Sequence, residues 1–239
     1  LGGVWSQVRI LSPRQKALEI TPVLFLYPVC LINRLHISFF LHNFVEIVSE
    51  KMEKHEIKKP KVIESEYLIR RPWLTARRDK LLLPDGRINP EFYVLEYPSW
   101  VNVIALTEDG KFVMVRQYRH GLGTISTELC AGVVEEGENP IDAAKRELSE
   151  ETGYTGGEWE LQCVISGNPS TTNNLSYCFL AKGVKQTEQQ HLDATEDIEV
   201  LVMTRDELLE LMMADEMKQS LMLAPLWRYF YLQERNSCR

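Results

Sequence analysis

Three glutamates, Glu147, Glu150 and Glu151, lie within a stretch of five residues. On an α-helix, side chains three and four residues apart are neighbours, and like charges at that spacing cost roughly 0.2–0.5 kcal/mol per pair. A divalent cation would offset this repulsion. Carboxylate oxygens suit Mg²⁺ or Mn²⁺, and Mg²⁺ commonly completes its shell with waters and substrate phosphate oxygens. The spacing therefore predicts a magnesium or manganese site for a phosphate compound; the alternative is a solvated acidic helix face.

The residues around the glutamates carry the start and stop signals of a helix. Asn139 suits the N-cap, Pro140 suits the first helical position, and Gly153 is able to end the helix in a left-handed conformation. The sequence predicts a helix of about three turns between them. The apolar stripe of this helix consists of Ile141, Ala144 and Leu148. We expect this stripe to pack against the protein and the carboxylates to face outward.

The glutamates belong to a longer pattern. It contains Gly132, five residues, Glu138, seven residues, and then Arg146-Glu147-Leu148-x-Glu150-Glu151-x-Gly153 followed by a bulky apolar residue. This pattern resembles the Nudix box at every defined position, although Tyr154 stands where an aliphatic residue is more usual. The resemblance extends over roughly Trp73 to Leu232. It implies an α/β fold, the Nudix α/β/α sandwich, with a mixed sheet and a small N-terminal β-rich unit.

Features outside the box resemble the ADP-ribose pyrophosphatase branch of the family. They are the run VRQYR from Val115 to Arg119, the run ELCAG from Glu128 to Gly132, Pro169, and the run EDIE from Glu196 to Glu199. Two departures are Cys130, where proline is usual, and the run NPSTTNN from Asn168 to Asn174.

The resemblance implies metal-dependent hydrolysis of the pyrophosphate bond of a nucleoside diphosphate sugar, with ADP-ribose giving AMP and ribose 5-phosphate. Three alternatives stay open: a UDP- or GDP-sugar, a dinucleoside polyphosphate, and a non-catalytic Nudix-like regulator that binds a nucleotide sugar.

The resemblance also implies roles for individual residues. Mg²⁺ or Mn²⁺ would be held by Glu147, Glu150 and Glu151, together with the backbone carbonyl of Ala131. Glu150 is counted as catalytic as well. Glu196 is the first candidate for the general base, with Asp193 and Glu199 as rivals.

Substrate binding is assigned to Arg119, Trp73 and Pro169. Arg119 would reach phosphate or ribose, with a surface ion pair as the alternative. Trp73 would stack on the base across a dimer in which the N-terminal unit is exchanged, with plain core packing as the alternative. Arg146 is expected to pair with a box carboxylate such as Glu138.

Composition limits the classes of partner and compartment. The 239 residues are 44% hydrophobic, which allows a full core, and carry a net charge of −7. This charge gives no electrostatic footprint for nucleic acid, so we expect no nucleic-acid partner and no membrane association. Five cysteines without C-x-x-C spacing favour a reducing cytoplasm.

The chain divides into three expected parts. Residues 1–51 contain no methionine before Met52, include the stretch SQVRILSPR, which looks like an in-frame translation of a tRNA gene, and have an apolar run, Ile20 to Ile32, that is too short to span a membrane. We interpret them as a non-native or disordered extension. Residues 52–97 are expected to form the β-rich unit that makes a homodimer, and residues 98–239 the Nudix hydrolase domain.

Patterning predicts the main elements. Extended runs around Leu81 to Leu83 and Phe92 to Leu95 flank the turn Pro84-Asp85-Gly86, and Val101 to Leu106 and Lys111 to Gln117 flank an Asp-Gly turn. Later strands are predicted at 159–166, 175–180 and 198–203, followed by amphipathic helices at 205–214 and 221–234.

Overall fold

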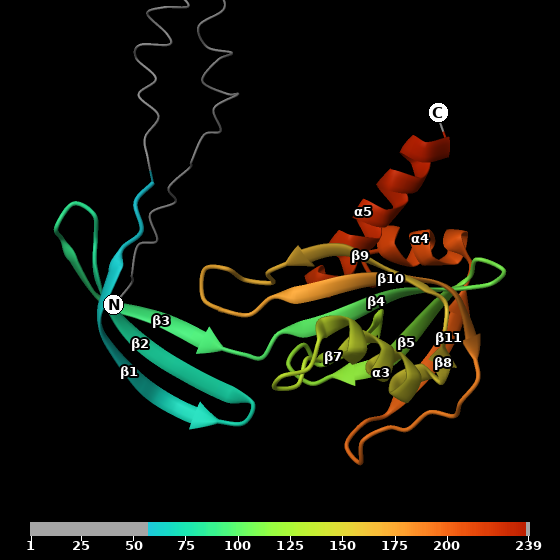
Figure 1. Ribbon diagram of the computed structural model, residues 1–239, viewed down its shortest axis with the longest axis horizontal. Helices are drawn as coiled ribbons and strands as arrows, with labels where there is room; N and C mark the ends of the chain where they lie inside the picture. Colours follow the sequence, from blue (N-terminus) through green and yellow to red (C-terminus); the bar gives the residue numbers. More distant parts are fainter. Residues whose placement is uncertain (1–56, 238–239) are drawn as a thin grey trace, which may run out of the picture. The chain divides into compact units, whose positions relative to one another are not determined.

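The computed structural model describes residues 57–237, which form an N-terminal three-stranded sheet, an eight-stranded sheet and three helices (Figure 1). The interpretation of residues 1–51 and of a start at Met52 falls outside the described residues. None of the helices in the described range is long and apolar enough to cross a membrane.

The N-terminal sheet is antiparallel and consists of β1 (Lys61–Arg71), β2 (Leu74–Leu82) and β3 (Ile88–Glu96) in that order. The predicted turn joins β2 to β3, and Gly86 there has a φ of +86°, which a residue with a side chain rarely adopts. The two predicted extended runs are confirmed as parts of β2 and β3. β1 was missed because its sequence, KVIESEYLIRR, shows no clean alternation of apolar and polar residues.

This N-terminal sheet lacks a covering layer within the described chain. Every residue of β1 is exposed, including Tyr67, Leu68 and Ile69. Cross-strand ion pairs, such as that of Arg78 with Glu66, tie the strands together. Three strands need a packed hydrophobic face for independent stability, so the N-terminal sheet is left with unburied apolar surface.

The eight-stranded sheet is mixed, as predicted. Its centre is β4 (Trp100–Thr107), which runs parallel to β10 (Ser176–Gln186) and antiparallel to β5 (Phe112–Arg119) and β7 (Cys130–Val133). The remaining strands are β6 (Thr124–Glu128) and β11 (Ile198–Met203), which pair with β5, and β8 (Tyr154–Thr155) and β9 (Glu158–Ile165), which pair with β10.

Two hydrophobic clusters lie on the two faces of this sheet, because successive strand residues point to opposite sides. Along β4, Val103 and Ala105 join the cluster that contains Ala144 and Leu148 of α3 (Pro140–Thr152). Ile104 joins the other cluster, which packs against α4 (Arg205–Met213) and α5 (Ser220–Ser237).

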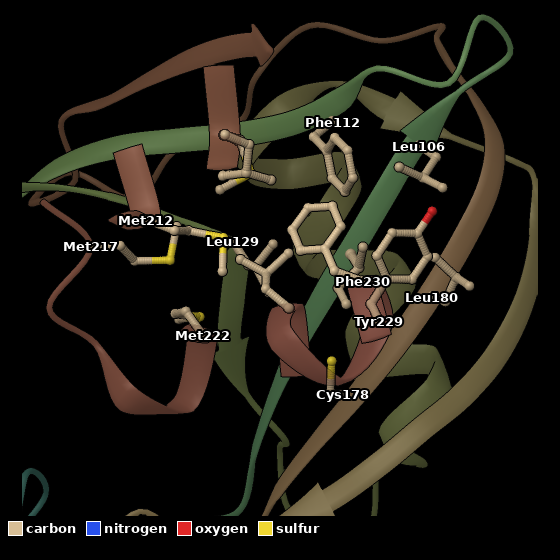
Figure 2. Close-up of a cluster of buried hydrophobic side chains, with 14 residues drawn as sticks. Leu106, Phe112, Leu129, Cys178, Leu180, Met212, Met217, Met222, Tyr229 and Phe230 are labelled. Carbon is tan, nitrogen blue, oxygen red and sulfur yellow. The ribbon is translucent and has the colours of Figure 1, made fainter. Parts of the chain in front are cut away.

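Figure 2 shows the second cluster, in which the Phe112 ring lies between the β-sheet and the rings of Tyr229 and Phe230 on α5, with ring centroids 5.8 and 5.7 Å away. Helices on both faces of a mixed sheet confirm the predicted α/β/α sandwich.

The remaining predictions of helices and strands are confirmed where the hydrophobic pattern extends over many residues. The β4–β5 hairpin turns at Gly110, whose φ is +77°, and β9, β11, α4 and α5 are found close to the predicted ranges. β10 begins near its predicted start but continues to Gln186, beyond the predicted end at residue 180. The short strands β6, β7 and β8 were not predicted, since two to five residues carry too little periodicity.

The helix α3 begins and ends as predicted, but one expectation about its faces was wrong. The Asn139 side chain accepts a hydrogen bond from the Ile141 N–H, and Gly153 closes the helix at φ +72°. The carboxylates do not all face outward: Glu151 is 4% exposed. α3 contacts the sheet and also the loop between β10 and β11, so part of its acidic side is enclosed as well as the apolar stripe.

Candidate active site

Arg146 is the centre of the charged network on α3. Its Nε and Nη2 donate to the two oxygens of Glu138 at 3.0 Å each, and its Nη1 donates to Glu147 at 2.8 Å and to Glu150 at 3.1 Å. Nη2 also donates to the Val133 carbonyl at 3.0 Å. Hydrogen bonding to Glu138, and then to the other carboxylates, raises the pKa of Arg146. The predicted pairing with Glu138 is confirmed, and the guanidinium ties the loop before α3 to the helix.

Glu151 occupies the inner end of the acidic side. Its Oε2 accepts a hydrogen bond from the Ala131 N–H at 3.1 Å, and the Cys130 thiol is its other partner. Burial raises the pKa of Glu151 to about 8. Among residues 57–237, no lysine or arginine forms an ion pair with this carboxylate. Burying a carboxylate without a cationic partner is unfavourable, so this position favours a bound cation.

Glu147 lies directly against the backbone of β7. A Cβ atom placed on Gly132 would stand 1.9 Å from Cδ of Glu147. Glycine is therefore required there so that the carboxylate and the strand can approach each other. Burial also raises the pKa of Glu147, although Arg146 opposes the shift.

The loop that carries Glu196 is fastened to the C-terminal end of α3. Gln190 donates to the carbonyls of Glu151 at 2.6 Å and Ile198 at 3.1 Å, and the His191 N–H donates to the Glu150 carbonyl at 2.9 Å. Sequence reasoning missed Gln190, since a lone polar residue in a loop gives no signal of its partners. The fastening brings this loop to the acidic side of the helix.

The three candidates for the general base have different surroundings. Glu196 is exposed and accepts a hydrogen bond from the Asp193 N–H at 3.0 Å. Burial is the main cause that raises the pKa values of Glu147 and Glu151, and the negative charge of Glu196 raises them further. Glu199 instead pairs with Arg116 at 3.3 Å. Within residues 57–237, Glu196 thus forms no ion pair with a basic side chain, and its charge acts on the box glutamates.

Arg119 forms an ion pair with Glu128. Its Nε and Nη2 donate to both carboxylate oxygens, the shortest at 2.6 Å, and Glu128 is 1% exposed. An ion pair, the alternative named for Arg119, is therefore present, although its partner is buried and not on the surface; contact with phosphate or ribose stays a prediction. Arg119 also lines a cavity of about 230 Å³.

That cavity lies beside the strand that begins the box. Its wall consists of Trp100, Arg119, Ala131, Gly132, Val133, Gln219 and Met222. A neighbouring cavity of about 250 Å³ shares Trp100 and Gln219 and is lined by the loop from Gly167 to Leu175. The sequence did not indicate either shared residue. Gln219 lies in the connection between α4 and α5, far along the chain from Trp100, so that only the fold brings the two together.

Two predicted substrate residues lie on exposed segments. Pro169 is exposed in the loop between β9 and β10. Trp73 is 75% exposed in the turn between β1 and β2. The alternative that Trp73 is core is wrong for the single chain.

The three box glutamates do not form a closed cage. In the part of the chain that the structure describes, no group of three or more His, Cys, Asp or Glu side chains converges as a metal site. Arg146 holds Glu147 and Glu150, while Glu151 turns to Ala131. Mg²⁺ needs only one or two carboxylates from the protein, so an open arrangement fits this ion.

Comparison with known proteins gives the family. A model described as NUDIX domain matches residues 97–224, and one described as Nucleoside diphosphate sugar hydrolase N-terminal domain matches residues 60–95. The chain belongs to the Nudix family. The family match and the relatives named as pyrophosphatases support a Nudix pyrophosphatase, and Nudix hydrolases generally use divalent metal ions.

Individual relatives agree with this family. A methanol dehydrogenase activator of Bacillus methanolicus is 33% identical over 151 residues, covering 63% of this chain and 81% of that protein. An ADP-ribose pyrophosphatase of Bacillus subtilis (strain 168) is 34% identical over 135 residues, covering 56% and 72%. A crystal structure of an ADP compounds hydrolase matches with a TM-score of 0.68 at 17% identity, covering 77% of this chain and 98% of that one, which shows a shared fold.

Replacing Gly132 by alanine should damage this Nudix site without unfolding it. The new Cβ would displace the Glu147 carboxylate, the movable end of a side chain. Because misplacement by about 1 Å can cost about a hundredfold in rate, we expect kcat to fall by about that factor. The thermal midpoint should change little. Gly121→Ala is the control, since a Cβ there meets nothing within 4 Å; equal rates in the two variants would contradict this account.

Burial of Glu151 should make the metal-free Nudix protein lose stability as the pH rises. The folded protein keeps a proton on Glu151 up to a pKa of about 8, whereas the unfolded chain releases it near its ordinary value of 4.5. The stability linked to this proton is therefore full below the lower value and is lost as the pH rises through the higher one, with a limiting slope of about 1.4 kcal/mol per pH unit.

Glu151→Gln removes this titration. In urea unfolding with a chelator present between pH 5 and pH 8, the free energy of unfolding of wild type should fall more steeply than that of the variant. Parallel curves would show that Glu151 is ionised throughout.

Proposed function

We propose that this chain is a divalent-metal-dependent pyrophosphatase of a nucleoside diphosphate sugar, and that its substrate is ADP-ribose, which it converts to AMP and ribose 5-phosphate. The observation that carries the proposal is the buried Glu151 carboxylate, which lacks a basic partner within residues 57–237 and lies beside Glu147 and the β7 backbone. The relatives named as ADP-ribose pyrophosphatases support the choice of substrate.

The residues present fit Mg²⁺ or Mn²⁺. Glu147, Glu150 and Glu151 would hold the ion together with the carbonyl of Ala131, a set made entirely of hard oxygen donors. When bound, the ion would neutralise charge on the diphosphate oxygens and favour attack by water. The buried carboxyl group of Glu151, which forms no ion pair with a basic side chain of residues 57–237, is the reason in this structure to expect such an ion.

Residues of the chain itself would accept the proton, position the carboxylates and contact the substrate. Glu196 accepts the proton of the attacking water, because its exposed carboxylate lies on a loop that is fastened to α3. Arg146 holds Glu147 and Glu150 in place until substrate arrives. Arg119, positioned by Glu128, faces the cavity beside Gly132 and contacts phosphate or ribose there.

The neighbouring cavities suit the organic parts of the substrate. Trp100 offers an aromatic surface at the junction of the two cavities. Pro169 belongs to the loop that borders the second cavity, and Asn168 and Asn174 of the same loop line that cavity. We assign Pro169 to substrate binding through this loop.

A homodimer completes the proposal. The N-terminal sheet exposes apolar side chains that its own chain leaves uncovered, and a second copy would bury them. Trp73, 75% exposed at the β1–β2 turn, would then be available to stack on the base in the partner's site. A cytoplasmic location agrees with three free thiols, those of Cys130, Cys163 and Cys178.

Other substrates and another class remain as alternatives to test. UDP- or GDP-sugars and dinucleoside polyphosphates contain the same diphosphate bridge. A regulator that binds a nucleotide sugar without turnover is a second candidate, favoured by the relative named as a methanol dehydrogenase activator.

A substrate panel tests the proposal directly. Purified protein with Mg²⁺ or Mn²⁺ should release AMP and ribose 5-phosphate from ADP-ribose, identified by chromatography, at a higher kcat/KM than from UDP- or GDP-sugars or dinucleoside polyphosphates. Glu150→Gln and Glu151→Gln should abolish this activity. Turnover of another compound with ADP-ribose untouched would reject the substrate, and tight binding without turnover would favour the regulator.

Glu196→Gln should lower kcat for ADP-ribose by about a hundredfold or more while KM changes little, because general base catalysis contributes about 10²–10⁴-fold. The limb of the pH–rate profile that reports the base should disappear. Glu199→Gln is the matched control on the same segment and should retain most of the activity. If the control loses as much as Glu196→Gln, the base is assigned wrongly.

Leu68→Glu should weaken the dimer, because a charge would enter the surface that the second copy buries. Light scattering after gel filtration should then show monomer at concentrations where wild type is dimeric. Leu161→Glu is a matched control, since Leu161 is 49% exposed and Leu68 is 46% exposed, both on strands.

Trp73→Ala should raise KM mainly, with partial recovery in Trp73→Phe. A monomeric wild type would refute this arrangement.

A further inference from the structure

Two cysteines face each other across neighbouring strands, away from the acidic side of α3. Cys163 on β9 is the direct antiparallel partner of Cys178 on β10. Both side chains point to the α5 face of the sheet, where Cys178 is fully buried in the cluster shown in Figure 2 and Cys163 packs against that cluster. Both are free thiols.

The register places these two residues directly opposite each other, next to a register shift between Cys178 and Phe179. Directly opposed residues of an antiparallel pair have Cα atoms about 4.5 to 5.5 Å apart. Disulfides join Cα atoms about 4.4 to 6.8 Å apart. The two thiol groups interact, since each shifts the pKa of the other. Bond formation would therefore require rotation of the side chains and little movement of the strands.

The two thiols differ in reactivity. Cys163 is partly exposed, and the hydrogen bond from Cys178, aided by the positive charge of Arg228, lowers its pKa. The same hydrogen bond, followed by burial, raises the pKa of Cys178. Because the thiolate is the reactive form, Cys163 is the nucleophile of the pair and Cys178 the thiol that resolves it.

We propose that Cys163 and Cys178 form a reversible oxidation site, at which a peroxide converts the opposed thiols into a cross-strand disulfide. The Cys163 thiolate attacks one oxygen of hydrogen peroxide, the O–O bond breaks, and the departing hydroxide takes up a proton to become water, leaving a sulfenic acid. The Cys178 sulfur then attacks the Cys163 sulfur, and the hydroxide displaced leaves with the Cys178 proton as a second water. Two thiols are oxidised by two electrons and one peroxide is reduced.

The pair belongs to a row of residues that crosses the sheet. Cys178 is in register with Asn102 on β4, and Asn102 is in register with Ala131 on β7. The Asn102 amide donates to the Ser176 hydroxyl and the Leu221 carbonyl, while its buried Oδ1 has no protein partner among the described residues. Oxidation would add a covalent link to the same row that carries Ala131.

Peptide mapping tests this proposal with the full chain and needs no substrate or metal. The reduced protein is treated with hydrogen peroxide at stoichiometric amounts, the remaining thiols are blocked with N-ethylmaleimide, and the protein is digested without reductant. Chymotrypsin cleaves after Tyr177, between the two cysteines. We expect the fragments that carry Cys163 and Cys178 to stay joined until dithiothreitol separates them.

Two variants sharpen the result. Cys163→Ser should leave Cys178 as an unoxidised thiol after the same treatment, whereas Cys130→Ser should form the disulfide as wild type does. The proposal is overturned if both thiols of the wild type remain open to alkylation after unfolding, if Cys163 proceeds to sulfinic acid with Cys178 unchanged, or if Cys163 pairs with another cysteine.

Discussion

The close approach of α3 to the backbone of β7 is the constraint on which the candidate active site depends. Glu147 stands where a side chain on Gly132 would otherwise be, and Glu151 accepts a hydrogen bond from the Ala131 N–H. This approach brings the two carboxyl groups against the backbone of Ala131 and Gly132. Three features hold the helix close to β7. They are the caps of α3, the buried Leu148, and the hydrogen bond that Arg146 donates to the Val133 carbonyl.

The charges around this contact are balanced unevenly. Arg146 neutralises the outer side, where it meets Glu138, Glu147 and Glu150. On the inner side, Glu151 has an N–H and a thiol as partners, and the nearby Arg119 is engaged with Glu128. A buried acid held this way keeps its proton or binds a cation. The uneven balance explains why the inner side of the site favours a bound cation.

The two sheets of the described chain bury their apolar side chains to different extents. The eight-stranded sheet is covered by α3 on one face and by α4 and α5 on the other, so that Val103 and Ile104 are both fully buried although they point in opposite directions. The N-terminal sheet has no such layers, and β1 stays exposed throughout. The proposed second copy would therefore cover the N-terminal sheet.

The sequence by itself determined the local features of this protein. Capping residues and the apolar stripe located α3, alternation and an Asp-Gly turn located the β4–β5 hairpin, and the spacing of the glutamates indicated the chemistry, because these signals act between residues a few positions apart. Only the tertiary structure decided that Glu151 is buried, that Glu128 is the partner of Arg119, and that Cys163 faces Cys178. A helical pattern gives the angle between two faces of α3, but which face is enclosed depends on strands and loops distant in the chain. Burial and strand register arise only when those segments meet.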